Sequence, residues 1–214
     1  YYFWPVFDGK VLPENPYQAL SDGQINGVDI LAGFNTDEGS LFVEQGLSEE
    51  GYIEYVRSIF GEHAQEVLDR YPVDDKNSPT DRARFIFKMS LRMGGDIFAD
   101  ELSDQGFKVY YYTFDFTTPE LDDTDSGTGH ALELPFVFDT FPEDLPLKPE
   151  TDALVDSIHS YWLNFIKNGD PHSASEPLWP AYARDRKTTM VLSTDMHDEP
   201  APDQDDVAFF REII

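Results

Sequence analysis

Two short loops in the sequence carry side chains that could do acid–base chemistry. "NTDEG" holds the carboxylates Asp37 and Glu38, and "GTGH" ends at His130. A carboxylate fixes the tautomer of an imidazole and stabilises its protonated form, while the imidazole takes a proton from a nucleophile. A carboxylate and His130 would therefore form the acid–base half of a catalytic triad if the loops converge. The alternatives are a solvated turn residue for Glu38 and a histidine at the border between loop and core for His130.

The nucleophile that would complete such a triad is missing. A serine hydrolase of the α/β type needs a serine in the pattern G-x-S-x-G, on a strained turn between a strand and a helix. Ser40 follows Gly39 but has no second glycine after it, and Ser126 precedes Gly127 without a glycine before it. On its own, this sequence does not complete a serine triad of that type.

The other four histidines give no sign of a metal site. His63 and His159 lie in helical patterns, His172 follows a helix stop and His197 lies in an acidic loop, so we expect structural or solvated roles. No two histidines have the HxxxH or HxH spacing of a zinc site, and the acidic residues lack the EF-hand pattern. No glycine-rich phosphate-binding motif is present. We therefore expect neither a metal nor a cofactor.

Each candidate loop follows a segment with the composition of a strand. "VDILAGF" (Val28 to Phe34) is a short apolar run that ends in a turn, and "KVYYYTFDF" (Lys108 to Phe116) is rich in aromatic and β-branched residues. "MVLS" is a shorter candidate for a last strand. In an open α/β sheet the ligand site lies beyond the carboxyl ends of the strands, so both loops could reach it.

Helical spacing of apolar residues fills most of the remaining chain. Gly94 and Gly95 interrupt one of these patterns, and each costs about 1 kcal/mol inside a helix, so we expect a kink or a break there. Strands that alternate with helices predict an α/β architecture with too few strands for a complete sheet. No linker separates two domains, so we expect residues 1–214 to be part of one domain. Five helices are expected. The first begins near Ser48, the second covers Glu62–Arg70, the third covers Asp81–Ser103, the fourth begins at Pro149 and ends at Asn168-Gly169, and the last is "VAFFREII".

The composition limits the partners of the protein. Of the 214 residues, 15 are basic and 42 acidic, which gives a net charge of −27, so nucleic acid and anionic membrane would be repelled. No stretch approaches the ~18 consecutive apolar residues of a membrane span, and the absence of cysteine excludes disulfides. The compartment stays open between cytoplasmic and secreted, and the acidic surface favours a bacterial source. The apolar start "YYFWPVFDG" is atypical of a chain terminus, so we expect a cut inside a larger protein.

Three segments in order resemble a known family. "FNTDEGSLF", "GHALELPFVF" and "YWLNFIKNGDP…LWPAY" are similar to consecutive motifs of the type-B carboxylesterases, which include bacterial para-nitrobenzyl esterases and the cholinesterases. The likeness runs from "PVFDGKVLP" to the end of the chain. It implies the C-terminal part of an α/β-hydrolase fold, with a mostly parallel sheet flanked by helices and left incomplete in this chain.

The resemblance also implies site residues and partners. Glu38 matches the acid of the family's Ser-Glu-His triad and His130 matches its base, while Leu41 and Phe42 match positions that line the substrate pocket. For Leu41 and Phe42 the alternative is a plain core position. The serine elbow and the oxyanion loop would then lie in a missing N-terminal half, the substrate would be a small uncharged ester, and the isolated chain would be inactive.

A second function stays open on sequence grounds. The same family contains adhesion proteins that lost the nucleophile, so the fold alone does not establish catalysis. The alternative to an esterase is therefore a non-catalytic interaction module with an esterase-like fold. A serine at the elbow position upstream would support the esterase, and a glycine or alanine there would support the interaction module.

Overall fold

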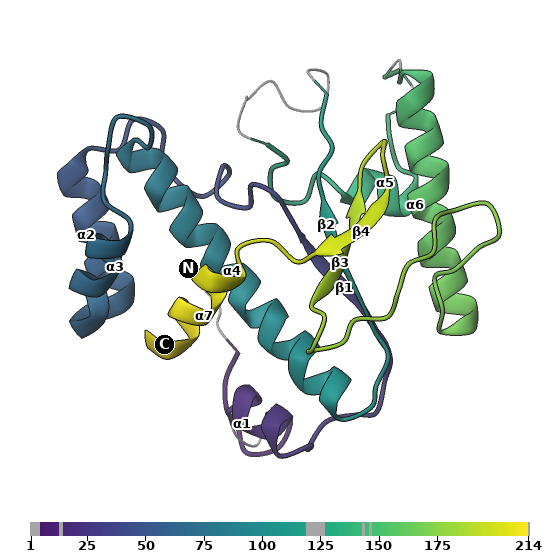
Figure 1. The fold of residues 1–214 in the computed structure, drawn as a ribbon, viewed down its shortest axis with the longest axis horizontal. Helices are drawn as coiled ribbons and strands as arrows, with labels where there is room; N and C mark the ends of the chain where they lie inside the picture. Colours follow the sequence, from purple (N-terminus) through teal and green to yellow (C-terminus); the bar gives the residue numbers. More distant parts are fainter. Residues whose placement is uncertain (1–4, 13–14, 119–126, 143, 146, 214) are drawn as a thin grey trace.

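The computed structural model describes residues 5–12, 15–118, 127–142, 144–145 and 147–213, and these residues contain a mixed four-stranded sheet (Figure 1). The strand order is β1-β2-β3-β4, in which β1, β2 and β3 are parallel and β4 is antiparallel to β3. The three predicted strands are confirmed, and β4 is an addition that begins at His197, where we expected a loop. The bounds are Ile30–Asn35 for β1, Val109–Phe114 for β2, Thr188–Leu192 for β3 and His197–Pro200 for β4.

The predicted helices are present, and two short ones are added. Ser48 caps the helix that follows it by accepting a hydrogen bond from the N–H of Gly51. Ser78 and Asp81 form a capping box at the start of the longest helix. The bounds are Pro16–Ser21 for α1, Glu49–Phe60 for α2, Ala64–Arg70 for α3, Pro79–Asp104 for α4, Leu134–Phe138 for α5, Pro149–Asn168 for α6 and Gln204–Ile213 for α7, with a 3₁₀ turn over Gly61–His63 before α3.

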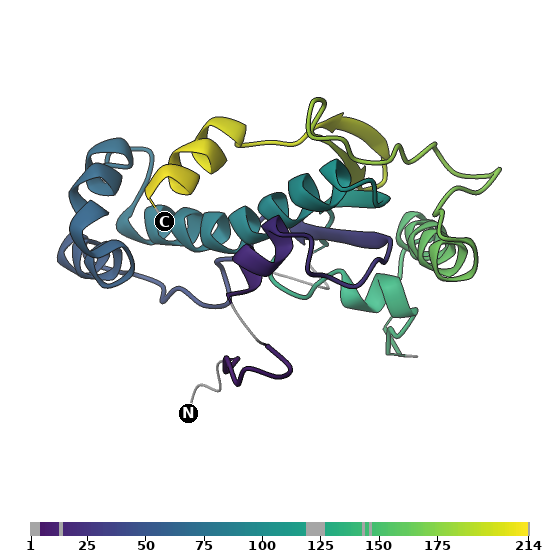
Figure 2. The same cartoon turned by 90° about the horizontal axis from the view of Figure 1, so that it is seen from below.

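Strand β2 is covered on both faces. Successive side chains of a strand point to opposite faces, so Tyr110 and Tyr112 lie in one cluster with α5 and α6, while Val109 and Tyr111 lie in another with α4. Figure 2 shows α4 and α6 on opposite sides of the sheet. This double cover explains why every residue of β2 is buried and why the segment has no polar alternation.

The expected break at Gly94 and Gly95 is wrong, because α4 continues through both residues. A Cβ atom on Gly95 would lie 2.7 Å from the hydroxyl oxygen of Tyr111, whereas one on Gly94 would have Tyr17 at 3.6 Å as its nearest neighbour. Gly95 therefore lets the helix approach β2 closely. The packing of the helix on the sheet outweighs the low helix propensity of the glycines.

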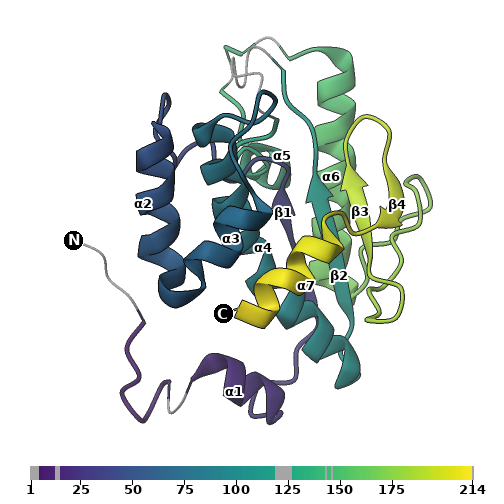
Figure 3. The same cartoon turned by 60° about the vertical axis from the view of Figure 1, so that its left-hand side comes forward.

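The C-terminal helix α7 packs against α4, and with α2 and α3 the two form a second layer of apolar packing (Figure 3). The rings of Tyr71 and Phe210 stack there with centroids 5.6 Å apart. An ion pair between a partly exposed arginine and a buried carboxylate adds to this contact, because Arg211 Nη1 lies 2.7 Å from Asp100 Oδ2. The end of the chain is thereby fixed to the helix that supports β1 and β2.

Candidate active site

Glu38 is held by the turn that follows β1. Its carboxylate oxygen Oε1 accepts a hydrogen bond of 2.8 Å from the backbone N–H of Asn35, the last residue of the strand. The next residue, Gly39, lies so close to α4 that a Cβ atom would be 2.6 Å from the carbonyl oxygen of Arg84. The glycine of "DEG" is therefore needed for the acid loop to pack on the helix.

His130 is held by the loop that reaches α5. The N–H of Asp37 donates to the carbonyl of Thr128 at 2.9 Å, and Asp37 forms an isolated parallel bridge with Gly129. These contacts extend the pairing of β1 and β2 beyond the sheet. Since β1 and β2 are parallel neighbours, the two loops leave from the same edge of the sheet (Figure 1).

The two loops bring Glu38 and His130 together. His130 Nδ1 lies 2.5 Å from Glu38 Oε2, although 92 residues separate them in the sequence. The Glu38 side chain is 9% exposed and that of His130 is 41% exposed. The carboxylate is thus enclosed while the ring reaches the surface.

The carboxylate beside the ring fixes its tautomer. An ionised carboxylate only accepts hydrogen bonds, so in the neutral imidazole Nδ1 of His130 is the donor and Nε2 carries the lone pair. Nε2 has no hydrogen-bond partner among the residues that the structure describes. The ring is thus arranged to take a proton at Nε2, with a carboxylate behind it to stabilise the resulting imidazolium.

Asp37, the other carboxylate of the loop, has a different environment. Burial raises the pKa of Asp37, and the nearby Arg84 guanidinium, whose Nη1 lies 3.9 Å from Oδ2, opposes that rise. The backbone carbonyl of Asp37 accepts from the hydroxyl of Ser40 at 3.2 Å. Ser40 therefore serves the turn and not the histidine.

The candidate substrate residues Leu41 and Phe42 are not core residues. Their exposed fractions are 68% and 52%, which contradicts the alternative of a plain core position. The ring of Phe42 lies edge-on to the imidazole of His130, with centroids 5.1 Å apart, and stacks on Phe87 at 4.7 Å. Phe42 thus forms an apolar wall beside the histidine, while Leu41 lies at the surface next to it.

Two functional candidates escaped the sequence reasoning. The side chain of Asn35 donates from Nδ2 to the carbonyl of Gly129 at 2.8 Å and to Oε2 of Glu133 at 2.6 Å. The pKa of the nearby Tyr112 is raised, first by burial and then by the charges of Glu133 and Glu38. The only signal for these two residues in the sequence was their position: Asn35 ends a predicted strand, and Glu133 lies just after His130.

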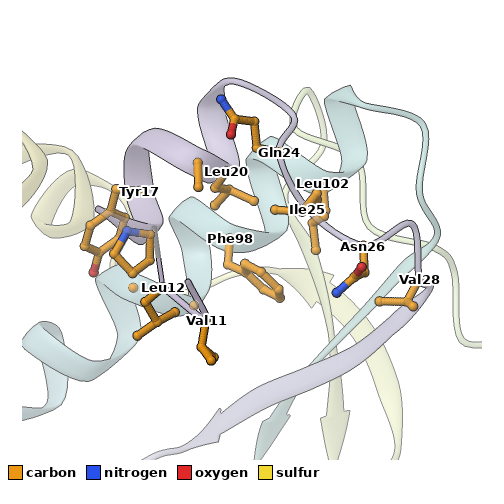
Figure 4. Close-up of a pocket in the computed structure, with 14 residues that line it drawn as sticks. Val11, Leu12, Tyr17, Leu20, Gln24, Ile25, Asn26, Val28, Phe98 and Leu102 are labelled. Carbon is orange, nitrogen blue, oxygen red and sulfur yellow. The ribbon is translucent and has the colours of Figure 1, made fainter. Parts of the chain in front are cut away.

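A separate apolar hollow lies elsewhere in the described part of the chain. It has a volume of about 920 Å³ and is found between α1, α4 and the residues before β1 (Figure 4). Its lining is mostly apolar and includes Val11, Tyr17, Val28 and Phe98. Val28 precedes the amino end of β1, whereas Glu38 follows its carboxyl end. The hollow is thus separate from the Glu38–His130 pair.

The described part of the chain contains no group of three or more His, Cys, Asp or Glu side chains that could hold a metal ion. None of the described helices is long and apolar enough to cross a membrane.

A sheet of parallel neighbours covered by helices on both faces, with a carboxylate and a histidine beyond the carboxyl ends of two of its strands, is typical of part of an α/β-hydrolase fold. Solved structures agree. The carboxylesterase EST55 of Geobacillus stearothermophilus at pH 6.2 matches with a TM-score of 0.80 and 31% identity, over 96% of this chain and 45% of that one.

Sequence comparison leads to the family. The pattern of the carboxylesterase family matches residues 1–210, so the chain belongs to that family. A para-nitrobenzyl esterase of Bacillus subtilis is 29% identical over 213 residues, which is 95% of this chain and 42% of that protein. A phenmedipham hydrolase of Pseudarthrobacter oxydans is 28% identical over 202 residues, or 89% of this chain and 40% of that protein. The chain thus spans less than half the length of these relatives.

Proposed function

We propose that this chain supplies the acid and the base of a serine carboxylesterase, as the C-terminal part of its catalytic domain. The observation that carries the proposal is the contact between Glu38 and His130, with Nε2 of the histidine unpaired among the described residues and the ring at the surface. The family and its esterase relatives support the same reaction class.

In the proposed reaction, a serine hydroxyl from the rest of the esterase attacks the carbonyl carbon of an ester. His130 Nε2 takes the hydroxyl proton and then gives it to the alcohol that leaves, so that an acyl-enzyme remains. Water, deprotonated by the same nitrogen, then attacks the acyl carbon. The bond between the acyl carbon and the serine oxygen breaks, and His130 returns the proton to that oxygen as the carboxylic acid leaves. Glu38 stabilises the imidazolium in both the acylation and the deacylation step. Backbone amides outside this chain would stabilise the oxyanion.

We further propose a small uncharged ester as substrate and the N-terminal half of the same polypeptide as partner. The exposed ring of Phe42 beside His130 suits an apolar acyl or alcohol group. β1 pairs only with β2 among the described strands, and the apolar hollow lies beside the start of β1 (Figure 4). These are the surfaces against which the rest of the sheet would pack.

Fluorophosphonate labelling of the complete polypeptide tests the proposal. We expect His130→Ala to abolish labelling or slow it at least ~100-fold, because a general base contributes about 10²–10⁴-fold. His172→Ala is the matched control, since His172 is exposed and lies outside both loops, and it should label like the wild type. If the His130 variant labels like the wild type, or if no protein labels, the esterase proposal is wrong and a non-catalytic interaction module becomes the better reading.

A further inference from the structure

Asn35 lies where the two loops of the acid–base pair meet. It ends β1 and is 1% exposed. Its backbone N–H donates to Glu38, while its side-chain amide donates to the carbonyl of Gly129 and to the carboxylate of Glu133. One buried residue thus contacts the acid and both sides of the base, since Gly129 precedes His130 and Glu133 follows it by three positions.

The hydrogen-bond partners fix the orientation of the Asn35 amide. A carbonyl oxygen and a carboxylate oxygen both face Nδ2, so a flipped amide would place its own oxygen against two acceptors. In the observed orientation Oδ1 is buried and has no hydrogen-bond partner among the described residues. A leucine would fill about the same space without an unpaired oxygen. Burial alone therefore gives no reason for an asparagine at this position.

We propose that Asn35 is a positioning residue that sets the distance and angle between Glu38 and His130, an inference that rests on the proposed esterase function. The backbone N–H fixes one carboxylate oxygen of Glu38 and leaves the other for Nδ1 of the ring. The side-chain amide fixes the loop on both sides of His130. A further link between the loops, from the N–H of Thr128 to the hydroxyl of Thr36, is longer at 3.2 Å and less buried.

The test is Asn35→Leu in the complete esterase. Leucine keeps the volume and the backbone N–H but removes both bonds that Nδ2 donates. We expect kcat to fall about 100-fold, as for a reacting group displaced by ~1 Å, while KM stays within about threefold because Asn35 lies beneath the site. Asn35→Asp keeps the shape but places a carboxylate oxygen where Nδ2 donates, and it should lose a similar factor. This second variant decides the matter if the leucine variant does not fold.

A second readout follows the ring directly. Proton NMR should show the Nδ1–H of His130 at low field in the wild type, with His130→Ala to assign it, and we expect the signal to weaken or vanish in both Asn35 variants. Thr189→Val is the control, because Thr189 is 1% exposed and bonds to Thr113 within the sheet, away from both loops. It should lower the unfolding temperature and leave kcat and the signal unchanged.

The outcomes are separable. Wild-type kcat and an intact Nδ1–H signal in the Asn35 variants would overturn the inference. An equal loss of kcat in Thr189→Val at matched stability would do so too, because the effect would then be general destabilisation. If His130→Ala keeps wild-type activity, the proposed function fails, yet the Nδ1–H signal still decides whether Asn35 positions the ring.

Discussion

Replacing Glu38 by glutamine should disable the base without changing its shape. Oε1 of Glu38 accepts from a backbone N–H at 2.8 Å, so the amide oxygen of the glutamine will keep that place. Its NH₂ group will then face Nδ1 of His130, where a carboxylate oxygen now lies at 2.5 Å. A donor in that place forces Nδ1 to accept, which moves the ring proton to Nε2 and removes the lone pair that takes the serine proton.

The size of the effect follows from this change of tautomer. The corresponding acid-to-amide change in a Ser-His-Asp protease lowers kcat by about 10⁴-fold, which is roughly 5 kcal/mol of transition-state stabilisation. The assay is kcat/KM for a p-nitrophenyl ester with the complete esterase, beside Glu44→Gln, an exposed control downstream in the same segment. A Glu38→Gln enzyme within tenfold of the wild type would refute the reasoning, since the ring would then not depend on an acceptor at Nδ1.

Three further predictions concern stability, each measured by denaturant unfolding of the chain. Gly95→Ala should cost roughly 1–3 kcal/mol through the clash with Tyr111. Gly94→Ala, whose Cβ would make only an ordinary van der Waals contact with Tyr17, should gain about 0.5–1 kcal/mol; equal effects would contradict the packing argument. Asp100→Ala should cost about 1.5–3 kcal/mol, because it removes a buried carboxylate that accepts from the Tyr182 hydroxyl and pairs with the partly exposed cations Lys187 and Arg211, and a loss below 1 kcal/mol would show that water reaches the cluster. Hydrogen bonds from the N-cap serine lower the pKa of Asp81 below 3.8. Its contribution, about 0.3–1 kcal/mol for an exposed carboxylate at a helix start, is present above pH 3.8 and is lost as the pH falls through the lowered pKa; Asp81→Ala should therefore match the wild type only in acid.

Local patterns were enough for the elements that hold the site. A strand that is covered on both faces needs aromatic and β-branched residues throughout, so the composition of β2 was enough to predict it. Ser48 marked the start of α2 through its capping side chain. Gly95 misled the same reasoning, since helix propensity measures an isolated helix and does not include a sheet that needs close approach. Phe42 lies at the surface beside a histidine, a place that its apolar character alone did not distinguish from a core position and that only the resemblance to the family suggested.

The contacts of Asn35 with the distant loop of His130 were beyond the sequence for a physical reason. Whether Asn35 reaches the loop of His130 depends on the parallel register that sets Asn35 opposite Phe114, because a shift of one residue turns every side chain of a strand to the other face. With that register, the side chain of Asn35 enters the space between the loops and finds two acceptors there. The same register brings Glu38 and His130 into contact, so the acid–base pair and the residue proposed to position it follow from one pairing of β1 with β2. A substitution that slips this pairing should therefore disrupt all three together, whereas one that removes only the Asn35 amide should leave the strands in place and move the ring.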